Sequence, residues 1–63
     1  MATLYRFIHF VNGAWLIIGS TEKEPIVDEV FVDDKNHHIR YQVNGIGGFE
    51  DDFTRDVTVT RIS

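Results

Sequence analysis

The chain has 63 residues, of which 43% are hydrophobic and 25% are charged, with one proline and no cysteine. This length allows a single domain, residues 1–63, with a thin hydrophobic core. The lack of cysteine excludes disulfides and cysteine-built zinc sites. The formal net charge of -4 has the wrong sign for a protein that gains its affinity by neutralising phosphates.

The longest apolar run, residues 14–18, has five residues, far fewer than the roughly 20 that cross a bilayer. Arg6, His9 and the pair Asn12-Gly13 interrupt the apolar N-terminal stretch, and no basic segment precedes it. This pattern argues against a signal peptide. We therefore expect a complete cytoplasmic product that begins at Met1.

Residues 3–11 and 14–20 are rich in aromatic and β-branched side chains, and they flank Asn12-Gly13. This pair favours a type I′ turn, so we predict a hairpin in which Val11 faces Ala14 and Phe7 faces Ile18. One face carries the largest ring and is expected to be the core: Leu4, Arg6, Ile8, Phe10, Trp15, Ile17 and Gly19. The other face then needs a cover, and we expect it to be the interface of a homodimer: Tyr5, Phe7, His9, Leu16 and Ile18.

A polar loop, residues 21–25, leads to a second predicted hairpin formed by residues 26–32 and 37–43. A four-residue loop, 33–36, places Val32 opposite His37 and pairs Glu29 with Arg40 on the solvent side. The side chains expected to face inward are Ile26, Val30, Val32, Ile39, Tyr41 and Val43. A three-residue loop would instead bring Val27 and Phe31 inward.

Residues 44–52 contain three glycines and are too irregular for a regular strand, and their acidic end is compatible with one helical turn. Residues 53–62 alternate between apolar and polar side chains and predict a final strand with Phe53, Val57 and Val59 on one side. We therefore expect an all-β fold: a single small five-stranded bent sheet, or an SH3-like or OB-like barrel, built from two hairpins plus a C-terminal strand.

No pattern predicts a metal site, a cofactor or catalysis. His37 and His38, with His9 or the nearby Asp33 and Asp34, suggest metal ligands, but adjacent strand residues point to opposite faces. Residues 45–48 resemble a phosphate-binding loop, yet carboxylates follow instead of lysine, and their spacing is not that of a calcium loop. Neither Ser20 nor Ser63 has the surroundings of a nucleophile.

All ten acidic residues lie within residues 22–34 and 50–56. Such segments can present a negative field to a basic partner, although loops are also charged simply because they are solvated. The residues expected to bind a partner in this way are Glu22, Glu24, Asp33, Asp34, Glu50, Asp51 and Asp52.

The sequence thus favours a non-enzymatic, acidic protein-binding domain. A chain of this kind could be an inhibitor or adaptor that docks on a basic surface of a larger, nucleic-acid-handling protein, as virus-encoded inhibitors of host defence do. The alternative is a single-stranded nucleic-acid-binding barrel, with bases stacked on aromatic rings and arginines on the backbone: Tyr5, Phe7, His9, Phe31, Arg6, Arg40, Arg55 and Arg61. A third interpretation is a subunit that only dimerises or scaffolds.

Overall fold

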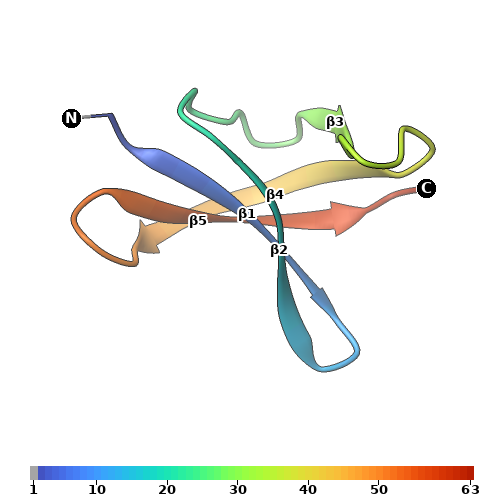
Figure 1. Ribbon diagram of the computed structural model, residues 1–63, viewed down its shortest axis with the longest axis horizontal. Coiled ribbons are helices and arrows are strands. Elements are labelled where there is room, and N and C mark those ends of the chain that lie inside the picture. The colour runs from blue at the N-terminus through green and yellow to red at the C-terminus, as the bar shows by residue number, and fades with distance from the viewer. Residues whose placement is uncertain (1) are drawn as a thin grey trace.

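The computed structural model describes residues 2–63, which form one five-stranded sheet and no helix (Figure 1). The strands are β1 (Leu4–Val11), β2 (Ala14–Thr21), β3 (Val30–Val32), β4 (Arg40–Phe49) and β5 (Thr54–Arg61). Their order across the sheet is β2-β1-β5-β4-β3. The predicted all-β class and the five-stranded bent sheet are confirmed. In this part of the chain no helix is long and apolar enough to cross a membrane.

The C-terminal strand lies at the centre of the sheet, parallel to β1 and antiparallel to β4. Apolar and polar side chains alternate along β5, which places Val57 and Val59 on one face of the sheet and threonines on the other. This alternation explains the central position of the strand. Val57 is fully buried, as is Val43 on β4. The remaining buried hydrophobic side chains are Tyr5, Tyr41 and Val59. The core therefore lies on one face of the sheet, over its three central strands.

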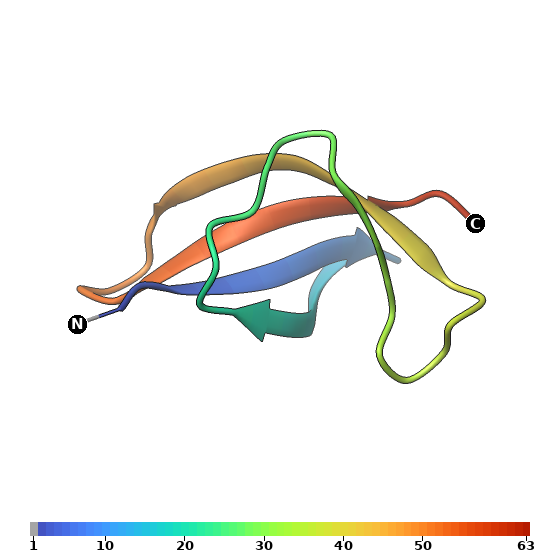
Figure 2. The ribbon, with the colours of Figure 1, turned by 90° about the horizontal axis from the view of Figure 1, so that it is seen from above.

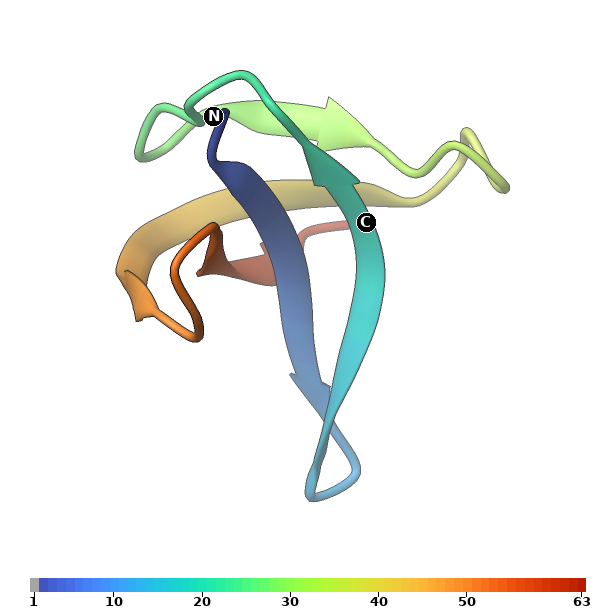
Figure 3. The ribbon, with the colours of Figure 1, turned by 60° about the vertical axis from the view of Figure 1, so that its left-hand side comes forward.

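The sheet curls around this core into a half-barrel (Figures 2 and 3). Phe7 on β1 and Phe31 on β3 are separated by two intervening strands, which in a flat sheet would keep them about 14 Å apart. Their ring centroids are instead 4.6 Å apart, and Phe31 stacks on Tyr41 at 5.7 Å. The two edge strands, β2 and β3, thus approach each other across the open side of the half-barrel.

The first hairpin has the predicted turn but not the predicted core face. Asn12 and Gly13 have φ angles of 52° and 79°, as a type I′ turn requires. The pairing of Val11 with Ala14 is confirmed, but a bulge at Ile18 places Phe7 opposite Gly19. The face carrying Trp15 is the outer face of the sheet, so its assignment to the core is wrong.

The second hairpin is shorter and in a different register from the prediction. Val32 pairs with Arg40, not with His37, because the connection is seven residues long. Two side chains lengthen it: Asp33 Oδ1 accepts the amide of Lys35, and Asn36 Oδ1 accepts the amide of His38. The register moves by three positions, an odd number, so Phe31 faces inward and Val30 and Val32 face outward. Tyr41 and Val43 do face inward, as predicted.

Pairing with β5 extends β4 through the glycine-rich segment, contrary to the prediction for residues 44–52. Two irregularities, at Asn44 and at Gly47-Gly48, absorb the extra residues. The acidic end forms a tight turn and no helix: Asp51 Oδ1 accepts the amides of Phe53 and Thr54, each at 2.8 Å. The glycines therefore bend a strand that the sheet retains.

Candidate protein-binding surfaces

The distal part of the first hairpin extends beyond the sheet (Figures 1 and 3). The last pair between β1 and β5 is His9 with Val59, so Phe10 and Val11 pair only with β2. This part of the structure is a two-stranded ribbon with no third strand beside it. Both of its faces are therefore open beyond the last pair with β5.

The ribbon and the adjoining part of its hairpin carry no charged side chain. Residues 7–21 contain no Asp, Glu, Lys or Arg, although a quarter of the whole chain is charged. On the outer face Phe10 and Trp15 form an edge-to-face pair with centroids 4.9 Å apart, and each is 54% exposed. Ile17 on the same face is 62% exposed, and Leu16 on the other face is half exposed. We call Phe10, Trp15, Leu16 and Ile17 the hairpin patch.

A second surface feature lies between the two edge strands. A groove of about 260 Å³ runs between the end of β2 and β3. Its lining residues include three aromatic residues, Phe7, Phe31 and Tyr41, and three acidic residues, Glu29, Asp33 and Asp34. We call it the seam groove, because it lies where the half-barrel stays open. A neighbouring hollow of about 400 Å³ shares five of its lining residues: Ile18, Gly19, Ser20, Asp33 and Asp34.

The predicted acidic residues fall into two groups. The first group consists of Glu22 and Glu24, which follow β2, and of Glu50, Asp51 and Asp52, which precede β5. Thr21 at the end of β2 and Arg55 near the start of β5 both pair with Tyr5, so the two segments lie at the same end of the sheet. Asp33 and Asp34 come from the β3–β4 connection and line one groove with Ser20 and Thr21, the residues that directly precede Glu22. The curl of the sheet therefore brings this second group beside the end of β2.

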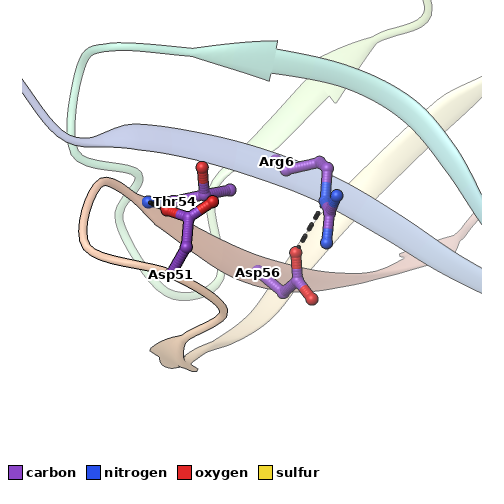
Figure 4. Close-up of polar contacts among 4 residues, drawn as sticks. All are labelled: Arg6, Asp51, Thr54 and Asp56. Carbon is purple, nitrogen blue, oxygen red and sulfur yellow. Dashed lines mark hydrogen bonds and ion pairs between the residues drawn. The ribbon is translucent and has the colours of Figure 1, made fainter.

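One ion pair organises the first acidic end (Figure 4). Arg6 Nε on β1 donates to Asp56 Oδ1 on β5 at 2.8 Å, on the outer face of the sheet. This hydrogen bond lowers the pKa of Asp56 below its ordinary value. Hydrogen bonding to the Asp56 carboxyl group raises the pKa of Glu50. The amides of Phe53 and Thr54 lower the pKa of Asp51.

The chain itself covers most of the face that the sequence assigned to a homodimer. Tyr5 is buried, Phe7 and Ile18 pack against the core, and His9 lies edge-on to Tyr41 at 5.4 Å. Of the five predicted interface residues, Leu16 is the most exposed. The cover that we expected from a second copy comes from β3 and β4, so the reason for placing a dimer interface here no longer holds.

The remaining sequence candidates form no assembled site. His37 and His38 lie in the β3–β4 connection, and within residues 2–63 no three His, Asp or Glu side chains are placed to hold a metal ion. The glycines of residues 45–48 belong to a paired strand. Ser63 donates its hydroxyl hydrogen to the carbonyl of His38.

The aromatic platform proposed for nucleic acid is largely engaged in the core. Tyr5 is buried, and Phe7 packs on Phe31. Arg6 is paired with Asp56, and Arg55 lies over the ring of Phe49 with its guanidinium carbon 5.1 Å from the ring centroid. Tyr5 is therefore withdrawn from the proposed platform, and two of its four arginines are engaged in contacts within the sheet.

Sequence reasoning missed the hairpin patch and the aromatic part of the seam groove. The absence of charge over residues 7–21 was a usable signal for the patch, because a hairpin buried on one face normally shows polar residues on the other. No comparable signal points to the groove, since its residues come together only through the curl of the sheet. Comparison with protein-family models, curated proteins and solved structures finds no match to this chain.

Proposed function

We propose that this chain is a non-enzymatic protein-binding domain that docks on its partner through the hairpin patch. One observation carries the proposal: the uncharged segment of the first hairpin, residues 7–21, exposes Phe10 and Trp15 on the ribbon that extends beyond the sheet, and Leu16 and Ile17 beside it. Apolar patches of this kind mark interaction sites on soluble proteins. Aromatic side chains also supply much of the binding energy at protein interfaces.

The charge distribution supports a basic partner. Residues 7–21 contain no charged side chain, so an apolar contact through the hairpin patch is free of the cost of burying charge. Complementary charges outside a contact act mainly on the association rate and on the choice of partner. The proposed role is that of an inhibitor or adaptor that occupies a basic surface of a larger protein, such as one that handles nucleic acid.

The test compares two chains in which an equally exposed isoleucine is replaced. Ile17 in the patch is 62% exposed, and Ile26 in the β2–β3 connection is 63% exposed. A partner captured from a cell lysate by the unmodified chain is purified, and its affinity for each variant is measured by calorimetry. We expect Ile17→Thr to weaken binding about tenfold, the loss that corresponds to about 1.4 kcal/mol. Ile26→Thr should bind within about twofold of the unmodified chain.

Equal affinity of the two variants for the partner would contradict docking through the hairpin patch. Retention of nucleic acid by the immobilised chain, with a steep dependence on salt, would contradict the proposed class of partner altogether.

A further inference from the structure

We propose that the seam groove binds the side chain of an arginine presented by a basic segment of the partner protein. The inference rests on the proposed protein-binding function and adds a specific contact to it. It depends on the shape, the lining and the charge of the groove, which are separate from the hairpin patch.

The groove is large enough for such a side chain. Its volume is about 260 Å³, whereas an apolar cavity of about 150 Å³ already admits a benzene molecule. It exists because β3 stops after three residues and the bulge at Ile18 turns the end of β2. The two edge strands therefore approach each other without closing the barrel.

The lining combines two features that a guanidinium group recognises. The rings of Phe7, Phe31 and Tyr41 are joined by contacts of 4.6 and 5.7 Å between centroids, and all three line the groove. Guanidinium groups stack on such rings, and the methylene stem of arginine packs on apolar surface. Glu29, Asp33 and Asp34 supply carboxylates, which accept charge-assisted hydrogen bonds.

The charge of the lining favours a cation. No lysine or arginine is among the residues that line the groove, whereas Arg6 and Lys35 line the neighbouring hollow together with Asp33 and Asp34. No three carboxylates in residues 2–63 come close enough together to hold a metal ion. A cation that fits must therefore be extended and delocalised, with an apolar stem, which describes arginine better than a metal ion or the compact ammonium of lysine.

The experiment uses three capped tripeptides, Gly-Arg-Gly, Gly-citrulline-Gly and Gly-Lys-Gly, titrated into the full chain and followed by the amide signals of its NMR spectrum. Citrulline has nearly the shape of arginine but no charge. We expect the arginine peptide to shift signals of Gly19, Phe31 and Asp34, with a dissociation constant on the order of 1 mM. The lysine peptide should bind several-fold more weakly and the citrulline peptide at least tenfold more weakly.

Two variants with the same change of net charge separate local from general electrostatics. Asp33→Asn with Asp34→Asn should weaken binding of the arginine peptide at least fivefold, while the amide oxygen at position 33 still accepts the hydrogen bond from Lys35. Glu22→Gln with Glu24→Gln removes two charges outside the groove lining and should leave the affinity within twofold.

Equal shifts with arginine and citrulline, shifts centred on Glu50–Asp52, or equal effects of the two double variants would overturn the proposal. The hairpin variant Ile17→Thr should bind the arginine peptide normally. A failure of the groove therefore remains distinguishable from a failure of the hairpin patch, which is measured with the purified partner.

Discussion

The carboxylate of Asp56 connects two other charged groups on the outer face of the sheet. It accepts a hydrogen bond from Arg6 Nε and interacts with Glu50. Because the pKa of Asp56 is lowered in the folded chain, the unfolded chain binds its proton more tightly. Asp56 therefore stabilises the fold above its unfolded pKa, and this stabilisation is lost as the pH falls through the folded pKa. The raised pKa of Glu50 acts in the opposite sense.

We expect Asp56→Asn to lower the midpoint of thermal unfolding at pH 7 relative to the unmodified chain. The difference should shrink as the pH is lowered below about 4, the ordinary pKa of an aspartate in the unfolded chain, and be lost as the pH falls through the lowered pKa of folded Asp56. Thermal unfolding followed by circular dichroism between pH 2 and pH 7 measures both effects. Asp52→Asn removes the same charge from the neighbouring turn and serves as the control. A constant difference over this range would mean that the ion pair contributes nothing to stability.

Gly47 on β4 lies close to the backbone of β5. A Cβ atom added here would lie 3.2 Å from the carbonyl oxygen of Asp56, whereas one added at Gly48 meets nothing within 4 Å. We expect Gly47→Ala to reduce the free energy of unfolding by about 1 kcal/mol, and Gly48→Ala to change it by less than about 0.5 kcal/mol. Urea unfolding measures the free energy of unfolding of both variants. Equal losses would contradict the close contact between residue 47 and the backbone of β5.

At the level of strands, the register of the second hairpin decides which valines are buried. Val43 is fully buried, whereas Val30 is 48% exposed on the outer face. Val43→Thr places a hydroxyl in the core and should cost about 1–3 kcal/mol. Val30→Thr, the same substitution on the outer face, should cost less than about 0.5 kcal/mol. If chemical denaturation shows that Val30→Thr costs as much as Val43→Thr, the register predicted from a four-residue loop, which buries both valines, is correct after all.

The strands also show what the sequence could predict. Asn12-Gly13 and the alternation of β5 act locally, and both predictions are confirmed. The inward position of Phe31 depends on a β3–β4 connection of seven residues, which contains hydrogen bonds from backbone amides to the side chains of Asp33 and Asn36. The residue types in this connection are equally compatible with the four-residue loop that we predicted. The core face of the first hairpin was ambiguous because both faces are apolar. Only the curl, which brings β3 to β1, decides between them.

Over the whole molecule, the acidic residues lie apart from the hairpin patch, whereas other exposed apolar side chains, such as Ile26, Phe49 and Phe53, stand close to them in the sequence. The hairpin patch is uncharged. The acidic residues lie in the segments that follow β2 and precede β5, and around the seam groove. This separation has a kinetic consequence. Charges that lie outside a contact steer the approach of a partner and have less influence on how long it stays.

We therefore expect Glu22→Gln with Glu24→Gln to slow association with the purified partner at low ionic strength and to leave the dissociation rate nearly unchanged. The dependence of the association rate on salt should weaken as well. Stopped-flow measurements at two salt concentrations test this. Unchanged association rates would show that these two carboxylates serve solubility alone.

The most direct test of docking through the hairpin patch uses Trp15, the only tryptophan of the chain. In the free chain this half-exposed indole should emit at the long wavelengths of a solvated ring and be readily quenched by acrylamide. Saturation with a purified partner that itself lacks tryptophan, or carries a fluorinated analogue with distinct emission, should shift the emission to shorter wavelengths and protect the ring from quenching. An unchanged spectrum and unchanged quenching at saturation would contradict the account, because the partner would then bind elsewhere on the molecule.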